Sequence, residues 1–366
     1  MALAERLPDF PWDTLADARR AAEAYPGGIV DLSVGTPVDP TPRLAVDALV
    51  AASDSPGYPT VWGDASTRAA IRGYLERRWA SVPLTDESVM PVVGTKELVG
   101  WLPTLLGIGD GAAVVFPECA YPTYEVGALT SGARAVALDD PEAIPADARL
   151  VWINSPANPS GRILSADETR AFVAAARRIG AVLASDECYG EFAWEAEPVS
   201  VLDPRVNDGD LTGLLAVHSL SKRSNAAGYR AGFVAGDPAV VQELVAARKH
   251  LGMMLPRPIQ AAMVALLGDQ DHVEEQRARY LARRALLRPA LEAAGFRVDH
   301  SEGSLYLWAT RDEDCRASVA WLAERGILAA PGDFYGPAAA RHVRVALTAT
   351  DERVAEAAAR LSPHAP

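Results

Sequence analysis

Cysteine is scarce in this chain, and a long apolar run is absent from its first residues, Met1 to Phe10. The 366 residues include only Cys119, Cys188 and Cys315, which are far apart and do not match the spacing of a metal site. An odd number of cysteines with no apolar leader segment indicates reduced thiols. We therefore expect a cytoplasmic protein with no bound metal.

Long apolar runs and a basic surplus are also absent. No run of about 18 apolar residues is present to span a membrane. The chain has 35 Lys and Arg against 48 Asp and Glu, a net charge of −13. Because a nucleic-acid-binding protein needs a basic face, neither a nucleic acid nor a membrane is expected as a partner. The length allows one large domain and a smaller one.

What the central chain does contain is a regular alternation of short β-rich runs with helical segments. Several runs are almost entirely apolar, which is typical of strands buried on both faces. The alternation predicts an α/β fold whose large domain holds a mostly parallel seven-stranded sheet. The predicted strands are Val89–Val93, Ala112–Phe116, Ala133–Leu138, Leu150–Asn154, Val182–Ser185, Leu214–Val217 and Phe233–Ala235.

The two ends of the chain follow a different pattern. Residues 1–45 read as an N-terminal arm and part of a small domain, with a strand at Ile29–Val34. A long helix is expected at about His272–Ala294, and two β-like pieces then alternate with helices. We predict a large domain at 46–285 and a small α+β domain at 286–366.

One lysine follows a predicted strand in the stretch 213–236. Ser219, Ser221 and Lys222 come directly after the strand, and Arg230 precedes the next one. A lysine amine attacks an aldehyde when burial or nearby cations lower its pKa. Hydroxyls and an arginine suit a phosphate. The pattern indicates Schiff-base chemistry with pyridoxal phosphate, and a strand-end lysine beside an ion-pairing arginine is the alternative.

Two further motifs follow strands at 94–96 and 116–124. Gly94-Thr95-Lys96 opens a helix, where free backbone N–H groups form a phosphate cradle. Tyr121 supplies an aromatic ring that can stack on a flat heteroaromatic cofactor. An ordinary strand–helix turn and a packing tyrosine are the corresponding alternatives.

The loop 154–161 and the segment 185–189 carry polar groups suited to a pyridine ring. Prolines fix the loop, and Asn158 can donate to a phenolic oxygen. A carboxylate such as Asp186, facing a pyridine nitrogen, keeps that nitrogen protonated and makes the ring an electron sink. Tyr189 can bond the ring oxygen. A turn role for Asp186 and packing for Tyr189 are the alternatives.

Read in chain order, these motifs resemble the class I/II aminotransferases of the fold-type I pyridoxal-phosphate superfamily, over nearly the whole chain. The resemblance implies that Lys222 binds the cofactor covalently and that Asp186 partners the ring nitrogen. Asn158 and Tyr189 would then partner the ring oxygen, and Tyr121 would stack on the ring. The residues implied at the phosphate are Gly94, Thr95, Lys96, Ser219 and Arg230.

The same resemblance implies a homodimer with shared active sites that acts on small amino and oxo acids. Tyr58 resembles the tyrosine that reaches the phosphate of the neighbouring subunit. Gly35 resembles the small residue near the substrate carboxylate, with Asn158 close by. Arg344, in the β-like segment 342–347, resembles the arginine that clamps the α-carboxylate, a role that suits its planar fork. A strand-edge surface arginine is the alternative.

Three stretches, 7–13, 249–254 and 330–336, resemble the actinobacterial succinyldiaminopimelate aminotransferases. That subfamily implies transfer from glutamate to N-succinyl-2-amino-6-oxopimelate. A broad-range aminotransferase, a pyridoxal-phosphate-dependent C–S β-lyase and a non-catalytic ligand-binding protein are the alternatives. The contacts of the distal carboxylate and succinyl arm stay open, with candidates chosen by charge alone: Arg20, Arg223, His250 and Arg257.

Overall fold

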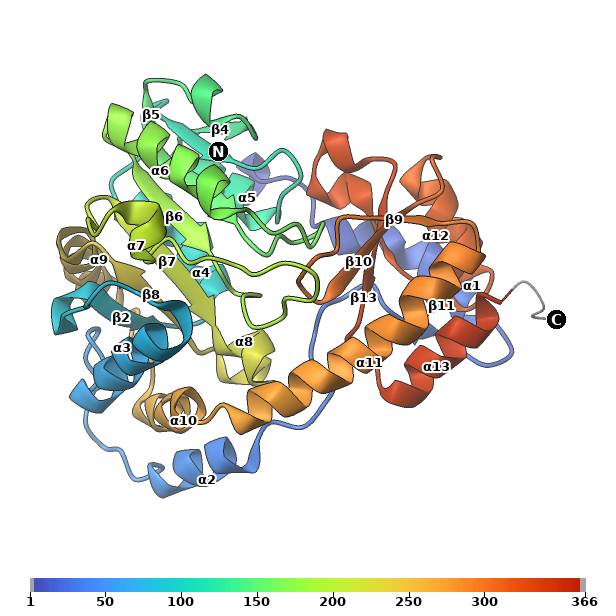
Figure 1. The fold of residues 1–366 in the computed structure, drawn as a ribbon, viewed down its shortest axis with the longest axis horizontal. Coiled ribbons are helices and arrows are strands. Elements are labelled where there is room, and N and C mark those ends of the chain that lie inside the picture. The colour runs from blue at the N-terminus through green and yellow to red at the C-terminus, as the bar shows by residue number, and fades with distance from the viewer. Residues whose placement is uncertain (1–2, 363–366) are drawn as a thin grey trace.

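A mixed seven-stranded sheet forms the centre of the larger part of the molecule in the computed structural model, which describes residues 3–362 (Figure 1). Strand β8 runs antiparallel to both its neighbours, β2 and β7, and the other strands are parallel to one another. The mostly parallel sheet that the sequence predicts is confirmed. In spatial order its strands are β2 (Val89–Val92), β8 (Gly232–Gly236), β7 (Leu214–Ser219), β6 (Val182–Asp186), β5 (Ala148–Asn154), β3 (Ala113–Phe116) and β4 (Arg134–Ala137).

The apolar strands face two separate hydrophobic cores. On β7, Leu214 and Ala216 belong to one core, and Leu215 and Val217 belong to the other. This alternation follows from the two-residue period of a strand, so a strand covered on both faces needs apolar residues throughout. Helices α3 (Ala65–Trp79), α6 (Ala166–Ile179) and α10 (Arg257–Gly268) cover one face, and α4 (Thr95–Leu105), α5 (Thr123–Ser131) and α9 (Pro238–Leu251) cover the other.

Local sequence signals fix several helix ends. Helix α6 begins with a capping box, in which the Ser165 hydroxyl accepts from the Glu168 N–H at 3.2 Å and Glu168 Oε2 accepts from the Ser165 N–H at 2.8 Å. It ends at Gly180, whose φ of +67° is left-handed. The shorter or peripheral helices are α1 (Ala16–Glu23), α2 (Arg43–Ala51), α7 (Pro204–Asn207), α8 (Leu220–Arg223), α12 (Cys315–Ala323) and α13 (Asp351–Arg360).

A smaller antiparallel sheet follows in the C-terminal part of the chain. Its order is β12 (Ala330–Pro331), β13 (Val343–Ala346), β10 (Tyr306–Thr310) and β9 (Arg297–Asp299). Figure 1 shows helix α11 (Asp271–Ala293) reaching from the larger part of the molecule to this sheet. The predicted boundary at residue 285 falls inside this one helix, and the division into 1–45, 46–285 and 286–366 stays a prediction.

The strand expected at Ile29–Val34 is wrong in length. Only Val30–Asp31 forms a strand, β1, which pairs in parallel with β11 (Ile327–Leu328). The Asp31 carboxylate accepts from the Ser33 N–H at 3.0 Å, and the Ser33 carbonyl accepts from Arg344 at 2.7 Å. The backbone groups that would extend the strand are therefore bound by side chains.

Within residues 3–362, no helix combines the length and the apolar character needed to cross a bilayer. The described chain also lacks any group of three or more His, Cys, Asp or Glu side chains placed to hold a metal ion.

Candidate active site

Lys222 lies on the one-turn helix α8, at the carboxyl end of β7. The Ser219 hydroxyl caps this turn by accepting from the Ser221 N–H at 3.1 Å. The Lys222 ammonium donates to the carbonyl of Gly35, 187 residues earlier in the chain. Burial lowers the pKa of Lys222, and the positive charges of Arg344 and Arg230 lower it further, against the opposing effect of Tyr306. The neutral, nucleophilic amine is therefore easier to reach than in an exposed lysine.

Asp186 ends the neighbouring strand β6 as a buried carboxylate. It accepts from the Tyr124 hydroxyl at 2.8 Å and from the Cys188 N–H at 3.2 Å. Burial raises the pKa of Asp186, outweighing these hydrogen bonds. No ion pair in the described chain involves Asp186. A buried acid without a cation fits a protonated ring nitrogen, which would supply the missing charge.

Arg344 is a buried cation without a carboxylate partner in the part of the chain that the structure describes. Its side chain is 3% exposed. One Nη donates to Asn158 Oδ1 at 2.8 Å and the other to the Ser33 carbonyl at 2.7 Å, while Nε has no partner among the described residues. Its guanidinium lies 4.0 Å from the centroid of the Tyr306 ring. A buried, uncompensated guanidinium is a site for an anion.

The start of α4 and Arg230 form a second place for an anion. No side chain of the described chain caps α4, so its first N–H groups are free of side-chain acceptors. Gly94 has a φ of +75°, and a Cβ there would overlap the Arg230 guanidinium. Only glycine therefore lets the guanidinium lie this close to the helix start. Thr95 and Ser219 line the same pocket.

These groups surround one pocket of about 300 Å³. Tyr121 meets Tyr124 edge-on, with ring centroids 5.8 Å apart, and burial raises the pKa of Tyr121 to about 12. The Tyr189 hydroxyl lies 2.9 Å from that of Tyr306. The predicted residues that line this pocket are Gly35, Thr95, Lys96, Tyr121, Asn158, Asp186, Tyr189, Ser219, Lys222, Arg230 and Arg344.

Two predicted site residues are absent from the lining of this pocket: Gly94, which directly precedes the lining residue Thr95, and Tyr58, which lies elsewhere. The Tyr58 side chain is 97% exposed. The cations suggested for a distal carboxylate are also elsewhere. Arg20 pairs with Asp17, Arg257 pairs with Asp64 at 3.4 Å, and Arg223 is buried against Glu191 at 3.3 Å. His250 is exposed on α9 and does not line the pocket either.

Sequence reasoning missed three residues of the site: Tyr124, Tyr306 and Trp12. Tyr124 belongs to the motif that supplied Tyr121, and its hydroxyl contact with Asp186 has no local signal. Tyr306 begins strand β10, and its sequence context indicates only a core residue. The packing of β10 against Tyr189 is what shows that Tyr306 belongs to the site. Trp12 lines the pocket from the N-terminal arm.

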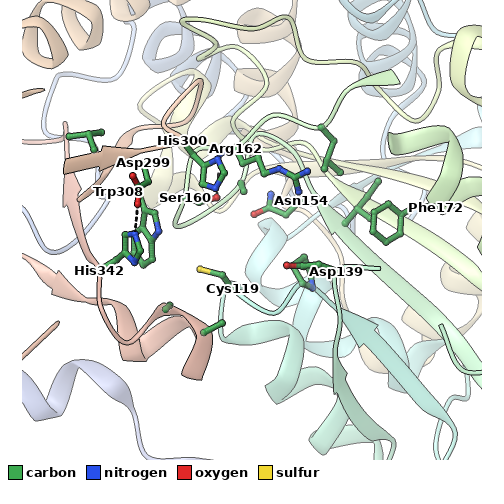
Figure 2. A pocket seen from close by; sticks show the side chains of 17 residues that line it. Cys119, Asp139, Asn154, Ser160, Arg162, Phe172, Asp299, His300, Trp308 and His342 are labelled. Carbon is green, nitrogen blue, oxygen red and sulfur yellow. Dashed lines mark hydrogen bonds and ion pairs between the residues drawn. The ribbon is translucent and has the colours of Figure 1, made fainter. Parts of the chain in front are cut away.

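A larger cavity of about 740 Å³ lies beyond Asn154, between the loops of the large sheet and the small sheet (Figure 2). Its charged groups are already engaged. His342 Nε2 pairs with Asp299 at 2.9 Å while its ring stacks on Trp308, and Arg162 pairs with Glu168. Lys222 and Asp186 are absent from its lining. The smaller pocket is therefore the candidate active site.

The arrangement of the smaller pocket fits one kind of cofactor. It combines a lysine with a lowered pKa, a buried acid without a cation, an aromatic ring and a place for an anion at the start of α4. An aromatic aldehyde with a basic ring nitrogen and a phosphate would meet each of these groups.

The chain belongs to the family of class I and II aminotransferases, whose family model matches residues 28–361. Pyridoxal 5′-phosphate is the cofactor of this family and fold, so the protein is a pyridoxal-phosphate-dependent aminotransferase. The sequence prediction of family and cofactor is confirmed. The prediction of small amino and oxo acid substrates holds at the level of the family.

Curated relatives cover nearly the whole chain. A probable aminotransferase of Mycobacterium tuberculosis is 60% identical, over 97% of this chain and 85% of its own length. The 4-dedimethylamino-4-oxo-anhydrotetracycline transaminase of Streptomyces rimosus is 55% identical, over 97% of this chain and 99% of its own. An LL-diaminopimelate aminotransferase of Dehalococcoides mccartyi is 31% identical, over 99% and 98%.

Solved aminotransferase structures share the fold. An aminotransferase from Neisseria meningitidis superimposes with a TM-score of 0.89 at 30% identity, covering 98% of each chain. A probable N-succinyldiaminopimelate aminotransferase from Thermus thermophilus gives a TM-score of 0.86 at 26% identity, over 96% of this chain and 99% of its own.

Proposed function

We propose that this aminotransferase moves the amino group of glutamate to N-succinyl-2-amino-6-oxopimelate. The observation that carries the proposal is the charge of the pocket. Four cations line it, and none forms an ion pair with a carboxylate of the described chain: Lys96, Lys222, Arg230 and Arg344. In our proposal Lys222 and Arg230 serve the cofactor. Arg344, buried inside the pocket, and Lys96, at its exposed mouth, are left to bind the substrate. An acceptor with two separated carboxylates would satisfy both.

The diaminopimelate type of acceptor has further support. The segments 7–13, 249–254 and 330–336 resemble the succinyldiaminopimelate subfamily. Relatives named for diaminopimelate chemistry match this chain over nearly its whole length, although at lower identity than the first two relatives.

The cofactor residues take the following roles in the proposal. When bound, pyridoxal 5′-phosphate supplies an aldehyde that holds the amino group and a ring that withdraws electrons. Asp186 holds a proton on the ring nitrogen, and Asn158 and Tyr189 bind the ring oxygen. Tyr121 stacks on the ring. The backbone at the start of α4, at Gly94, Thr95 and Lys96, binds the phosphate together with the side chains of Ser219 and Arg230, and the Lys96 ammonium is left for the substrate.

Lys222 and Arg344 act on the substrate. Arg344 binds the α-carboxylate with its fork of N–H groups, beside Asn158 and Gly35, and so fixes the position of the substrate Cα. Lys222 then takes the proton from Cα as a general base and would deliver it, as a general acid, to the cofactor carbon that carries the amino group. Its lowered pKa keeps a fraction of the amine neutral for the first of these steps.

A half-reaction experiment tests the proposed acceptor. Glutamate is added alone to the purified protein, and the absorbance of the bound cofactor is followed. N-Succinyl-2-amino-6-oxopimelate is then added. We expect the absorbance to be lost with glutamate and to return with this acceptor. A return only with common 2-oxo acids would contradict the acceptor and favour a broad-range enzyme, and pyruvate release from a sulfur amino acid would identify a C–S β-lyase.

One relative favours a second candidate acceptor. The Streptomyces rimosus enzyme, named for a 4-oxo-anhydrotetracycline, is 55% identical to this chain over 99% of its own length. The pocket mouth beside Lys96 holds Trp12, and Phe10 is 55% exposed close to it, so apolar surface is available for a polycyclic ketone. The same assay decides between the candidates when this ketone replaces the succinylated acceptor.

We also infer a homodimer with shared sites. The Tyr58 ring is almost fully exposed, although tyrosine is an amphipathic residue that is usually partly covered. A neighbouring subunit would bury it against that subunit's phosphate site. The cytoplasmic location stays a prediction of the sequence.

A further inference from the structure

Tyr306 is a buried residue of the small sheet that lies against three residues of the site: Tyr189, Arg344 and Gly35. Its side chain is 3% exposed. Its hydroxyl lies 2.9 Å from the Tyr189 hydroxyl, with the two ring centroids 5.6 Å apart. Its ring carries the Arg344 guanidinium at 4.0 Å. A Cβ at Gly35 would overlap its hydroxyl and lie 2.7 Å from Cζ. The absence of a side chain at Gly35 therefore makes room for Tyr306.

In the Tyr189–Tyr306 pair, either hydroxyl can donate to the other. Burial opposes ionisation of Tyr306, but the charges of Arg344 and Lys222 and the hydrogen bond with Tyr189 together lower the pKa of Tyr306. Burial raises the pKa of Tyr189. Tyr306 is therefore the stronger acid of the two and, while both hydroxyls are neutral, the better donor to the other oxygen.

An anionic oxygen beside Tyr189 would reinforce this direction. A charge-assisted hydrogen bond is roughly twice as strong as a neutral one, so the Tyr189 proton would turn to that oxygen. Tyr306 would then donate to the Tyr189 oxygen. Hydrogen bonds in such a chain polarise and strengthen one another.

We propose that Tyr306 is a positioning residue that acts through Tyr189, orienting the Tyr189 hydroxyl toward the ring oxygen of the cofactor. The proposal rests on the proposed role of Tyr189 and adds to it a residue from the small sheet. It also gives Gly35 a role that is independent of the substrate, because Gly35 keeps the Tyr306 hydroxyl in place.

The test is the pH titration of the bound cofactor's absorbance, without any substrate. Hydrogen-bond donors to the ring oxygen stabilise the deprotonated form of the bound cofactor, because the ring oxygen carries its full negative charge in that form. These donors therefore keep the pH midpoint of the absorbance titration low. Tyr306→Phe keeps the ring beside Arg344 and removes the hydroxyl. We expect its midpoint to rise by about half to one pH unit, the size of one hydrogen bond.

Two comparisons separate positioning from a structural effect. Tyr335→Phe is the matched control, because Tyr335 also lies beside Arg344, at 5.1 Å, and its buried hydroxyl has no partner among the described residues. We expect no shift from it. Tyr189→Phe should raise the midpoint, and the double variant Tyr189→Phe/Tyr306→Phe should raise it no further, since Tyr306 acts through Tyr189.

The outcomes also separate this inference from the proposed function. Equal midpoints for the wild type and Tyr306→Phe, or additive shifts in the double variant, would overturn the positioning role while leaving the aminotransferase intact. A wild type that uses a different acceptor would overturn the proposed substrate without affecting the titration. If Tyr306→Phe does not fold, Gly35→Ala displaces the same hydroxyl, and an unchanged midpoint in that variant would overturn the inference.

Discussion

At the scale of single residues, the chemistry of Lys222 depends on neighbours that are remote in the chain. Its amine is held at Gly35, and Arg344 and Arg230 place positive charge nearby. Burial and these charges act in the same direction, because both disfavour the ammonium form. A lysine in this environment becomes a nucleophile at a pH where an exposed lysine is still protonated.

This predicts the pH dependence of Lys222 acetylation in the cofactor-free protein. Because its pKa is lowered, the reaction should rise through a midpoint below about 10.4, the ordinary value. Arg344→Gln should move the midpoint upward, since it removes a positive charge. The chain has three lysines, so peptide mass spectrometry resolves each, and the exposed Lys249 reports on the reagent. A midpoint that Arg344→Gln leaves unchanged would contradict the electrostatic explanation.

A substitution of Lys96 tests whether this side chain binds the second carboxylate of the acceptor, as we propose. Lys96→Gln should lower kcat/KM for the succinylated acceptor by about two- to fivefold, because one ion pair is lost at an exposed position. Activity with pyruvate, which has no distal carboxylate, should stay the same. Lys249→Gln is the control for the loss of surface charge. An equal loss with both acceptors would show that Lys96 serves the cofactor instead.

At the scale of elements, the pocket is built from the short links that follow strands. Helix α8 begins immediately after β7, and two residues separate β2 from α4. In an open α/β sheet, the carboxyl ends of parallel strands meet at one edge, so links that are distant in sequence converge there. Gly94, in the link between β2 and α4, determines how close the Arg230 guanidinium comes to the start of α4.

Gly94→Ala should weaken pyridoxal phosphate binding by roughly ten- to a hundredfold, because the new Cβ displaces the Arg230 guanidinium and charged hydrogen bonds are lost. Gly107→Ala is the matched control. Gly107 follows the other end of α4 with a φ of +66°, and no atom lies within 4 Å of its added Cβ. Both variants should lose similar thermal stability, since both force alanine into a left-handed conformation. Equal cofactor affinity in the two would contradict the steric argument.

At the scale of the whole molecule, the predicted dimer determines whether each site is complete. Tyr58 cannot contribute to the pocket of its own chain while it is 97% exposed. If it reaches the partner's phosphate site, Tyr58→Ala and Lys222→Ala damage different halves of a shared site. A mixed dimer of the two variants would then contain one intact site.

Mixing the two variants after reversible dissociation should therefore restore roughly a quarter of wild-type activity, because half of the dimers are mixed and each has one intact site of two. The activity of each variant alone is the baseline. No gain on mixing, with mixed dimers confirmed by native mass spectrometry, would contradict a shared site.

The sequence by itself determined the family, its cofactor and the layered fold. Lys222, Asp186 and Asn158 each lie in a short motif that follows a strand, and such motifs depend only on neighbouring residues. The apolar runs that became β5, β6 and β7 were equally visible, because strands buried on both faces leave few polar positions. The capping box at Ser165 fixed the start of α6 for the same local reason.

Tertiary structure decided the contacts between remote segments. Tyr306 meets Tyr189 across 117 residues, and Arg344 meets Asn158 across 186. No periodicity or spacing reports such pairs, because they arise when the small sheet packs against the large one. The length of β1 was decided in the same way, since Arg344 and Asp31 bind backbone groups that a longer strand would have used. Local signals thus specify which groups are present, and packing specifies which of them meet.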